Sequence, residues 1–279
     1  MKRTLNAAAL IALAVLASAQ PALAADAGKP AAAAPVSEQI KRGREIAGTV
    51  DRNDAGFADY VVNGRMTLRR PGGATAERSF EMNTLEVRDG GDKRLVVFSQ
   101  PRDLAGFVSL TFTNAGAPDD QWIYLPAAKR VKRLAARDKT GSFAGSEFSY
   151  EDIATWELAN YDYEFVRDEP CGEPKTTCHT IANLPKYEYS GYSKLVETID
   201  PRIWQPVRIV YFDKSGRELK RLDFHGYQKF DGKFWRPTRI VMTNLLDKAV
   251  SEISWDKYRF KTGLKAGDLT DARMESWSR

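Results

Sequence analysis

The sequence contains few of the residues from which metal and redox sites are built. Among its 279 residues there are two cysteines, Cys171 and Cys178, and two histidines, His179 and His225. A zinc site needs more ligands than this pattern brings together. Haem attachment needs a closer pair of cysteines before the histidine than this chain supplies. We therefore expect no metal site and no cofactor.

The sequence motifs of the common enzyme classes are also missing. The chain has no Gly-x-Ser-x-Gly elbow, no His-Glu-x-x-His pair, no phosphate loop and no dinucleotide fingerprint. Asp119-Asp120 and Glu151-Asp152 are adjacent carboxylates. Neighbours on a strand point to opposite faces, so adjacency alone does not make a catalytic pair. We expect that the protein is not an enzyme.

Beyond its first residues, the sequence has no segment of transmembrane length. Lys2 and Arg3 precede an apolar stretch over residues 7–17, and the small-x-small triplet Ala22-Leu23-Ala24 follows it. This pattern predicts a cleavable secretory signal peptide (1–24), cut after Ala24, and a periplasmic location. Residues 25–36 are low in complexity and predict a flexible leader, which leaves 37–279 as one domain.

The predicted export leads to two further expectations, one about the cysteines and one about partners. In an oxidising periplasm, Cys171 and Cys178 are expected to form a structural disulfide that contributes about 2–3 kcal/mol. The net charge of +5, from 42 basic and 37 acidic residues, suits peripheral or transient contact with an anionic membrane surface. It does not require nucleic acid, and export argues against that partner.

The patterning after residue 56 is that of strands and turns. Apolar and polar residues alternate from Tyr60 to Arg69, and Pro71-Gly72-Gly73 ends this run. Similar short runs joined by tight turns continue to residue 125 and resume after residue 206. A short helix is expected before them, capped by Ser37 and weakened by Gly43. The pattern predicts a mainly β fold, a single curved antiparallel sheet with a few helices.

Residues 141–153 differ from this pattern. A glycine-rich loop leads into Ser149, with Asp152 three residues later, which is a capping pair at the start of a short helix. Ile153 and Trp156 are then placed to face the sheet. We interpret the segment as a lid or an internal plug.

The order of these landmarks resembles the outer-membrane lipoprotein-sorting family, relatives of LolA and LolB. The resemblance rests on Trp122-Ile123-Tyr124-Leu125-Pro126, on the Gly-Ser-x-Phe-Ser-Tyr-Glu-Asp string from Gly145 to Asp152, and on Pro201-Arg202-x-Trp204-x-Pro206-Val207 before Tyr211-Phe212-Asp213. It covers roughly Ser37 to Arg259. The chain has no lipobox cysteine, which distinguishes it from LolB.

The resemblance implies an unclosed, LolA-like half-barrel with helices on its concave face and a hydrophobic cavity between them. It also implies periplasmic transport of lipoproteins or other lipids towards an outer-membrane acceptor. Members of this branch are often associated with exporters of the resistance-nodulation-division type. No single arginine of this chain matches the arginine that latches the lid of LolA.

A half-open sheet with an apolar concave face offers a route to lipid binding, because each buried methylene contributes about 0.8 kcal/mol. For any one apolar residue, ordinary core packing is the alternative. The candidate cavity residues are Tyr60, Val62, Met66, Leu68, Phe80, Met82, Val97, Leu110, Phe112, Trp122, Tyr124, Phe148 and Trp156.

Two surface features suggest contacts with partners. The basic run Lys129, Arg130, Lys132 and Arg133, with Arg137 and Lys139 beyond it, suits anionic headgroups or an acidic partner; a solvated strand face explains it equally well. The aromatic residues Trp204, Tyr227 and Trp235 suit a docking surface, or else cross-strand pairing. We predict a non-catalytic periplasmic carrier of lipid or lipoprotein acyl chains. The alternative is an adaptor of an exporter.

Overall fold

The computed structural model describes residues 36–87, 90–172 and 174–278. The predicted signal peptide lies outside the described residues, and so does the predicted leader except for Val36. Helices are few: α1 (Val36–Asp54), α2 (Tyr150–Ile153) and α3 (Met274–Trp277), with short 3-10 helices at η1 (Pro126–Ala128), η2 (Ala136–Thr140), η3 (Leu158–Asn160) and η4 (Asp271–Arg273).

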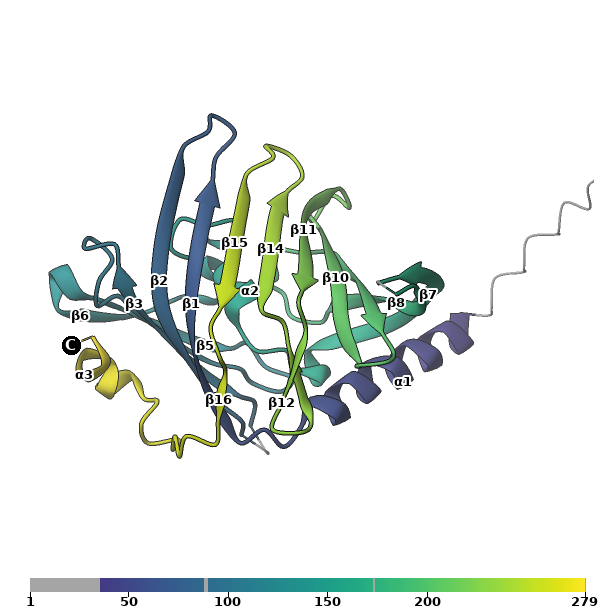
Figure 1. The fold of residues 1–279 in the computed structure, drawn as a ribbon, viewed down its shortest axis with the longest axis horizontal. Coiled ribbons are helices and arrows are strands. Elements are labelled where there is room, and N and C mark those ends of the chain that lie inside the picture. Colours follow the sequence, from purple (N-terminus) through teal and green to yellow (C-terminus); the bar gives the residue numbers. More distant parts are fainter. Residues whose placement is uncertain (1–35, 88–89, 173, 279) are drawn as a thin grey trace, which may run out of the picture. The chain divides into compact units, whose positions relative to one another are not determined.

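Strands dominate the described chain, as the alternating pattern predicts (Figure 1). The strands of the first half are β1 (Asp59–Arg69), β2 (Thr75–Leu85), β3 (Lys93–Gln100), β4 (Val108–Phe112), β5 (Asp120–Leu125) and β6 (Arg130–Arg133). Those of the second half are β7 (Tyr161–Cys171), β8 (Thr176–Pro185), β9 (Lys194–Asp200), β10 (Gln205–Phe212), β11 (Glu218–His225), β12 (Gln228–Phe230), β13 (Phe234–Arg236), β14 (Arg239–Asn244), β15 (Val250–Trp255) and β16 (Arg259–Phe260).

Two antiparallel meanders join into one large sheet. The order is β6-β5-β4-β3-β2-β1-β15-β14-β11-β10-β9-β8-β7, with β16 also paired to β1. The junction lies between β1 and β15, where Met66 is opposite Ile253. Within the described residues, β6 and β7 are the two edges and do not pair, so the sheet is an unclosed half-barrel. The fold class predicted from the sequence is confirmed.

Helix α1 packs closely on β7 because of one glycine. A Cβ atom at Gly43 would lie 2.7–2.8 Å from backbone atoms of Glu164 and Phe165. Gly43 is therefore the point of closest approach rather than only a weak position in the helix. The helix is also longer than expected. It spans Val36–Asp54, so Ser37 lies inside it and does not cap it as predicted.

The sheet is buried on both faces over part of its area. On the inner face, the main core joins β1, β2 and β15 to the loop before α2, through side chains such as Met66, Ile253 and Phe148. On the outer face, the C-terminal segment places Leu269 and Met274 against Leu110. This second layer was not foreseen, because the C-terminal segment has no clear periodicity.

The Asp231-Gly232 turn lies between β12 and β13. Phe230 pairs with Phe234, so the loop between these strands has three residues. Asp231 and Gly232 both adopt positive φ, which is why this dipeptide suits the turn.

Candidate functional site

The connection between the two edges of the sheet crosses its inner face. Strand β6 ends at one edge and β7 begins at the other, so residues 134–160, here called the crossing segment, must span the width of the sheet. Phe143 and Phe148 of this segment are almost fully buried in the main core. In Figure 1, α2 lies behind β14 and β15. The segment therefore forms an internal plug, one of the two roles expected for it.

A capping box shapes the plug at the start of α2. The backbone N–H of Ser149 donates to Asp152 Oδ2 at 2.7 Å, and the backbone N–H of Asp152 donates to Ser149 Oγ at 3.2 Å. The sequence-based capping prediction is confirmed. Asp152 also accepts a hydrogen bond from the Tyr192 hydroxyl at 2.7 Å, and it forms a buried ion pair with Lys220 on β11 at 2.5 Å. The same carboxylate thus caps the helix and anchors it to the sheet.

Glu151 anchors the plug at a second point. Its side chain accepts hydrogen bonds from the Tyr187 hydroxyl, the Ser190 hydroxyl and the Gly191 N–H at 2.5–2.8 Å. Burial raises the pKa of the Tyr187 hydroxyl, and the nearby Glu151 carboxylate raises it further, so Tyr187 remains a hydrogen-bond donor.

An arginine from β3 holds the end of the plug. Arg94 Nη1 donates to the carbonyl oxygen of Ile153 at 2.7 Å, and its Nη2 donates to the Tyr60 hydroxyl at 3.3 Å. Its Nε donates to Thr84 Oγ1 at 3.2 Å. Sequence patterning did not single out Arg94, because an arginine on a strand next to a lysine is typical of a solvated face.

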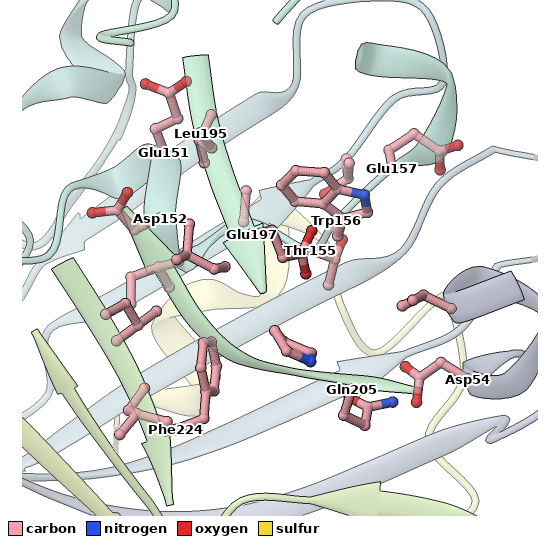
Figure 2. A pocket seen from close by; sticks show the side chains of 18 of the residues that line it. Asp54, Glu151, Asp152, Thr155, Trp156, Glu157, Leu195, Glu197, Gln205 and Phe224 are labelled. Atoms are coloured by element: carbon pink, nitrogen blue, oxygen red, sulfur yellow. The ribbon is translucent and has the colours of Figure 1, made fainter. Parts of the chain in front are cut away.

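A cavity of about 360 Å³ lies between the inner face of the sheet, α1 and the crossing segment (Figure 2). This size falls within the range of about 300–1,000 Å³ for small-molecule sites. Its apolar wall comes mainly from the second meander and α1, and it includes Ala47, Val50, Leu195, Ile199, Ile209, Leu222, Phe224, Ile240 and Ile253.

Aromatic side chains line the mouth of the cavity. Trp156 stacks on Tyr161 with ring centroids 4.1 Å apart, and its Nε1–H donates to the Tyr163 hydroxyl at 3.2 Å. The side chain of Trp156 is 41% exposed although it lines the cavity, which places it where the cavity meets solvent. Burial raises the pKa of the Tyr161 and Tyr163 hydroxyls, so both stay neutral.

The cavity wall is also acidic. Figure 2 shows Asp54, Glu151, Asp152, Glu157 and Glu197 around the pocket. Burial raises the pKa of Glu197 to about 7, and a hydrogen bond from Asn183 opposes this only in part. Carboxyl groups thus outnumber the basic groups Arg94 and Arg236 among the residues that line the cavity.

Four of the thirteen predicted cavity residues line this cavity: Tyr60, Met82, Phe148 and Trp156. Four others, Val62, Met66, Leu68 and Phe80, face the same side of the sheet but are packed in the main core. For these four the structure shows the ordinary packing that was the alternative for each.

The remaining five lie on the opposite face of the sheet: Val97, Leu110, Phe112, Trp122 and Tyr124. This placement corrects the expectation that they face the cavity. On β4 and β5, three buried inner positions are polar: Ser109, Thr111 and Gln121. Of these, Gln121 holds the plug, since it donates to the carbonyl oxygen of Tyr150 at 3.0 Å. The apolar positions face outward because the C-terminal segment covers them there.

Sequence reasoning missed most of the cavity wall. Leu195, Glu197 and Ile199 belong to β9, a strand that was not assigned. Apolar and polar residues do not alternate there, and the usable signal was the β-branched residues Val196, Thr198 and Ile199. Ile209, Leu222 and Ile240 were assigned to strands but not to a cavity.

The basic patch occupies an edge of the sheet. Lys129, Arg130, Lys132 and Arg133 are exposed on or beside β6, and Arg133 pairs with Asp120. Lys139 is not part of this patch, since it is 3% exposed and pairs with Asp119 at 2.7 Å. Consecutive strand residues alternate in direction, so the patch follows an edge rather than one face.

Other predictions concern the rest of the described chain. Cys171 and Cys178 form a disulfide between the paired ends of β7 and β8, as predicted. Trp204, Tyr227 and Trp235 are each partly buried rather than fully displayed. No described helix combines the length and the apolar character needed to cross a membrane.

Comparisons with known proteins agree with this geometry. A domain assigned to outer membrane lipoprotein sorting, from Vibrio parahaemolyticus, is 34% identical with a TM-score of 0.82, and the match covers 85% of this chain and 99% of that one. The chain belongs to the LolA-like family of outer-membrane lipoprotein-sorting proteins. A family model described as an uncharacterized protein matches residues 90–276.

Two further solved structures have the same fold as this LolA-like protein. A DUF1329 family protein from Desulfovibrio piger is 28% identical with a TM-score of 0.79, covering 85% of this chain and 99% of that one. A LolA superfamily protein from Nitrosomonas europaea is 18% identical with a TM-score of 0.63, covering 85% and 98%. Comparison with curated protein sequences finds no match.

Proposed function

We propose that this LolA-like protein is a periplasmic carrier that holds a lipid, or the acyl chain of a lipoprotein, non-covalently in the cavity. The observation that carries the proposal is the space of about 360 Å³ left between an apolar wall and the plug. Protein interiors are otherwise close-packed, so a space of this size favours a ligand. Each methylene that enters it contributes about 0.8 kcal/mol.

The relatives support a carrier role of this kind. The domain from Vibrio parahaemolyticus is assigned to outer membrane lipoprotein sorting, and transfer of that role would place this chain in the periplasm. The basic edge at β6 would give transient contact with anionic lipid surfaces during loading or release. We propose carriage without catalysis.

Filling the cavity tests the proposal. Ile240 of β14 lines the cavity, whereas its neighbour Val241 points to the other face of the sheet. Ile240→Trp is expected to lose most of the binding of the uncharged fluorescent probe phenylnaphthylamine, and Val241→Trp to keep it. Thermal unfolding of both variants checks that each is folded. Equal probe binding by the two folded variants would contradict the proposal, as would a wild type that does not bind the probe.

A further inference from the structure

Glu197 is a buried carboxyl group of the cavity that has no cationic partner among the described residues. It lies on β9, is 9% exposed, and lines the cavity wall. Its Oε2 accepts a hydrogen bond from Asn183 Nδ2 at 2.8 Å. Among the described residues, no lysine, arginine or histidine forms an ion pair with it. A carboxylate buried in this way is costly unless a cation compensates it.

Two other carboxylates of the cavity with buried side chains have such cations, and Glu151, which has none among the described residues, accepts three hydrogen bonds instead. Asp152 pairs with Lys220, and Asp119 pairs with Lys139. Asp54 pairs with Arg236. Beside Glu197, the amide oxygen Oδ1 of Asn183 is buried and receives no hydrogen bond from the described residues. The Asn183 amide oxygen therefore lacks a hydrogen-bond donor, and the Glu197 carboxyl group lacks a cationic partner, among the described residues.

The residues that line the whole cavity also favour a positively charged ligand. Seven carboxyl groups line it. The basic groups around it are Arg94 and Arg236, which also line it, and Lys139 and Lys220, which pair with two of the carboxylates. An excess of negative charge attracts cations and repels phosphates and carboxylates. An anionic headgroup is thus disfavoured inside the cavity, whatever the basic edge at β6 contacts outside it.

Aromatic residues near Glu197 complete the site. Tyr163 is directly opposite Asn183, whose side chain donates to Glu197, and Tyr211 lies two residues beyond Ile209, which is directly opposite Glu197. Both tyrosines line the cavity. An ammonium group that pairs with a carboxylate is further stabilised by neighbouring aromatic faces.

We propose that the ligand of this cavity is an amphiphile with a protonated amine, which pairs with Glu197 while its alkyl chain lies against Leu195, Ile199 and Ile209. The inference rests on the proposed function, because it specifies the polar group of a ligand that the cavity holds. Ligand entry would then supply the cation that the folded chain itself does not.

Alkyl ligands of one chain length separate the claim that the cavity binds an alkyl chain from the claim that it prefers an amine. Dodecylamine, dodecanol and dodecanoate would each displace phenylnaphthylamine from the wild type, from Glu197→Gln, and from the control Glu218→Gln. Glu218 is exposed on β11 and does not line the cavity. We expect the wild type and the control to bind dodecylamine at least about ten-fold more tightly than dodecanol, because a charge-assisted hydrogen bond to a carboxylate is stronger than one from a hydroxyl. Dodecanoate should bind more weakly than dodecanol.

The effect of Glu197→Gln distinguishes an ion pair from a merely structural glutamate. We expect the variant to bind dodecylamine and dodecanol about equally, with dodecanol binding unchanged. Equal displacement by dodecylamine and dodecanol in the wild type would overturn the inference and leave the proposed carrier function standing. The same holds if the amine preference survives in Glu197→Gln. Failure of the probe and of all three alkyl ligands to bind would overturn both.

Discussion

The carboxylate of Asp152 lies 2.5 Å from the ammonium group of Lys220, and this buried pair joins the plug to strand β11. The two residues are 68 positions apart in the chain, and their side chains are 1% and 8% exposed. The Lys220 ammonium group also donates to the carbonyl oxygen of Glu147 at 3.1 Å and lies over the rings of Tyr192 and Tyr211. The pair is therefore part of a satisfied polar network inside an otherwise apolar core.

Lys220→Met is expected to lower the free energy of unfolding by about 3–5 kcal/mol, because it leaves Asp152 buried without its cation. Denaturant unfolding measures this change. Lys220→Met combined with Asp152→Asn should recover part of the loss. The exposed pair Arg217–Asp213 is the control, and Arg217→Met should cost no more than about 1 kcal/mol. A Lys220→Met protein as stable as the wild type would contradict the assignment.

Two glycines of α1 should respond in opposite directions to the same change. Gly43→Ala would place a Cβ atom 2.7–2.8 Å from the backbone of β7, so we expect it to push the helix away and lower the midpoint of thermal unfolding. At Gly48 the nearest atom is the flexible end of Arg52 at 3.1 Å. Gly48→Ala should therefore be neutral or stabilising by up to about 1 kcal/mol, as alanine is in helices. Equal effects at the two sites would contradict the packing described.

Glu197 makes stability depend on pH. Folding raises the pKa of this buried carboxyl from its ordinary value of 4.5 to about 7. Between these values the folded protein holds a proton that the unfolded chain has released, so stability falls as pH rises through this window. Glu197→Gln removes this dependence. Its free energy of unfolding, relative to that of the wild type, should therefore increase by about 3 kcal/mol from pH 4.5 to pH 8.

Urea unfolding of both proteins without ligand checks this expectation. Burial above all, and the Glu197 carboxylate as well, raises the pKa of the Tyr163, Tyr211 and Tyr227 hydroxyls, so these groups do not titrate in this range. A difference between the two proteins that stays constant with pH would show that folding does not raise the pKa of Glu197. In that case the account of its burial would be wrong.

Fixing the plug should prevent exchange of ligand. The hydroxyls of Thr113, at the end of β4, and Thr155, after α2, are 2.6 Å apart, so cysteines at both positions are within bonding reach. We expect the oxidised double-cysteine protein to neither take up nor release the fluorescent probe at the wild-type rate. The single variant Thr155→Cys is the control. Unchanged exchange in the crosslinked protein would show that the cavity opens elsewhere.

The sequence was sufficient to predict the sheet because period-two alternation is a local property. Tyr60 to Arg69 showed it clearly, and the Ser149–Asp152 capping pair was equally local. Alternation alone does not say which face of a strand meets the cavity. Leu110 and Tyr124 were therefore assigned to the wrong side, since the C-terminal segment that covers them lies far along the chain.

The cavity was harder to predict because it depends on contacts between distant segments. The burial of Glu197, which raises its pKa, follows from the three-dimensional structure and is not visible in the sequence around it. In the sequence, Lys220 is one polar residue of an ordinary strand pattern, and only the structure shows that it pairs with Asp152 of the plug. Charged residues inside a core are set by their partners, and sequence order does not reveal such partners.

The central claim is that the cavity carries a lipid-like ligand, and the most direct test is native mass spectrometry of protein isolated from the periplasm, followed by organic extraction and lipid analysis. The account predicts a stoichiometric bound lipid or acylated peptide that Ile240→Trp no longer retains. A mass corresponding to protein alone, unchanged after incubation with lipid vesicles and lipoprotein, would contradict it and favour an adaptor that binds a partner without cargo.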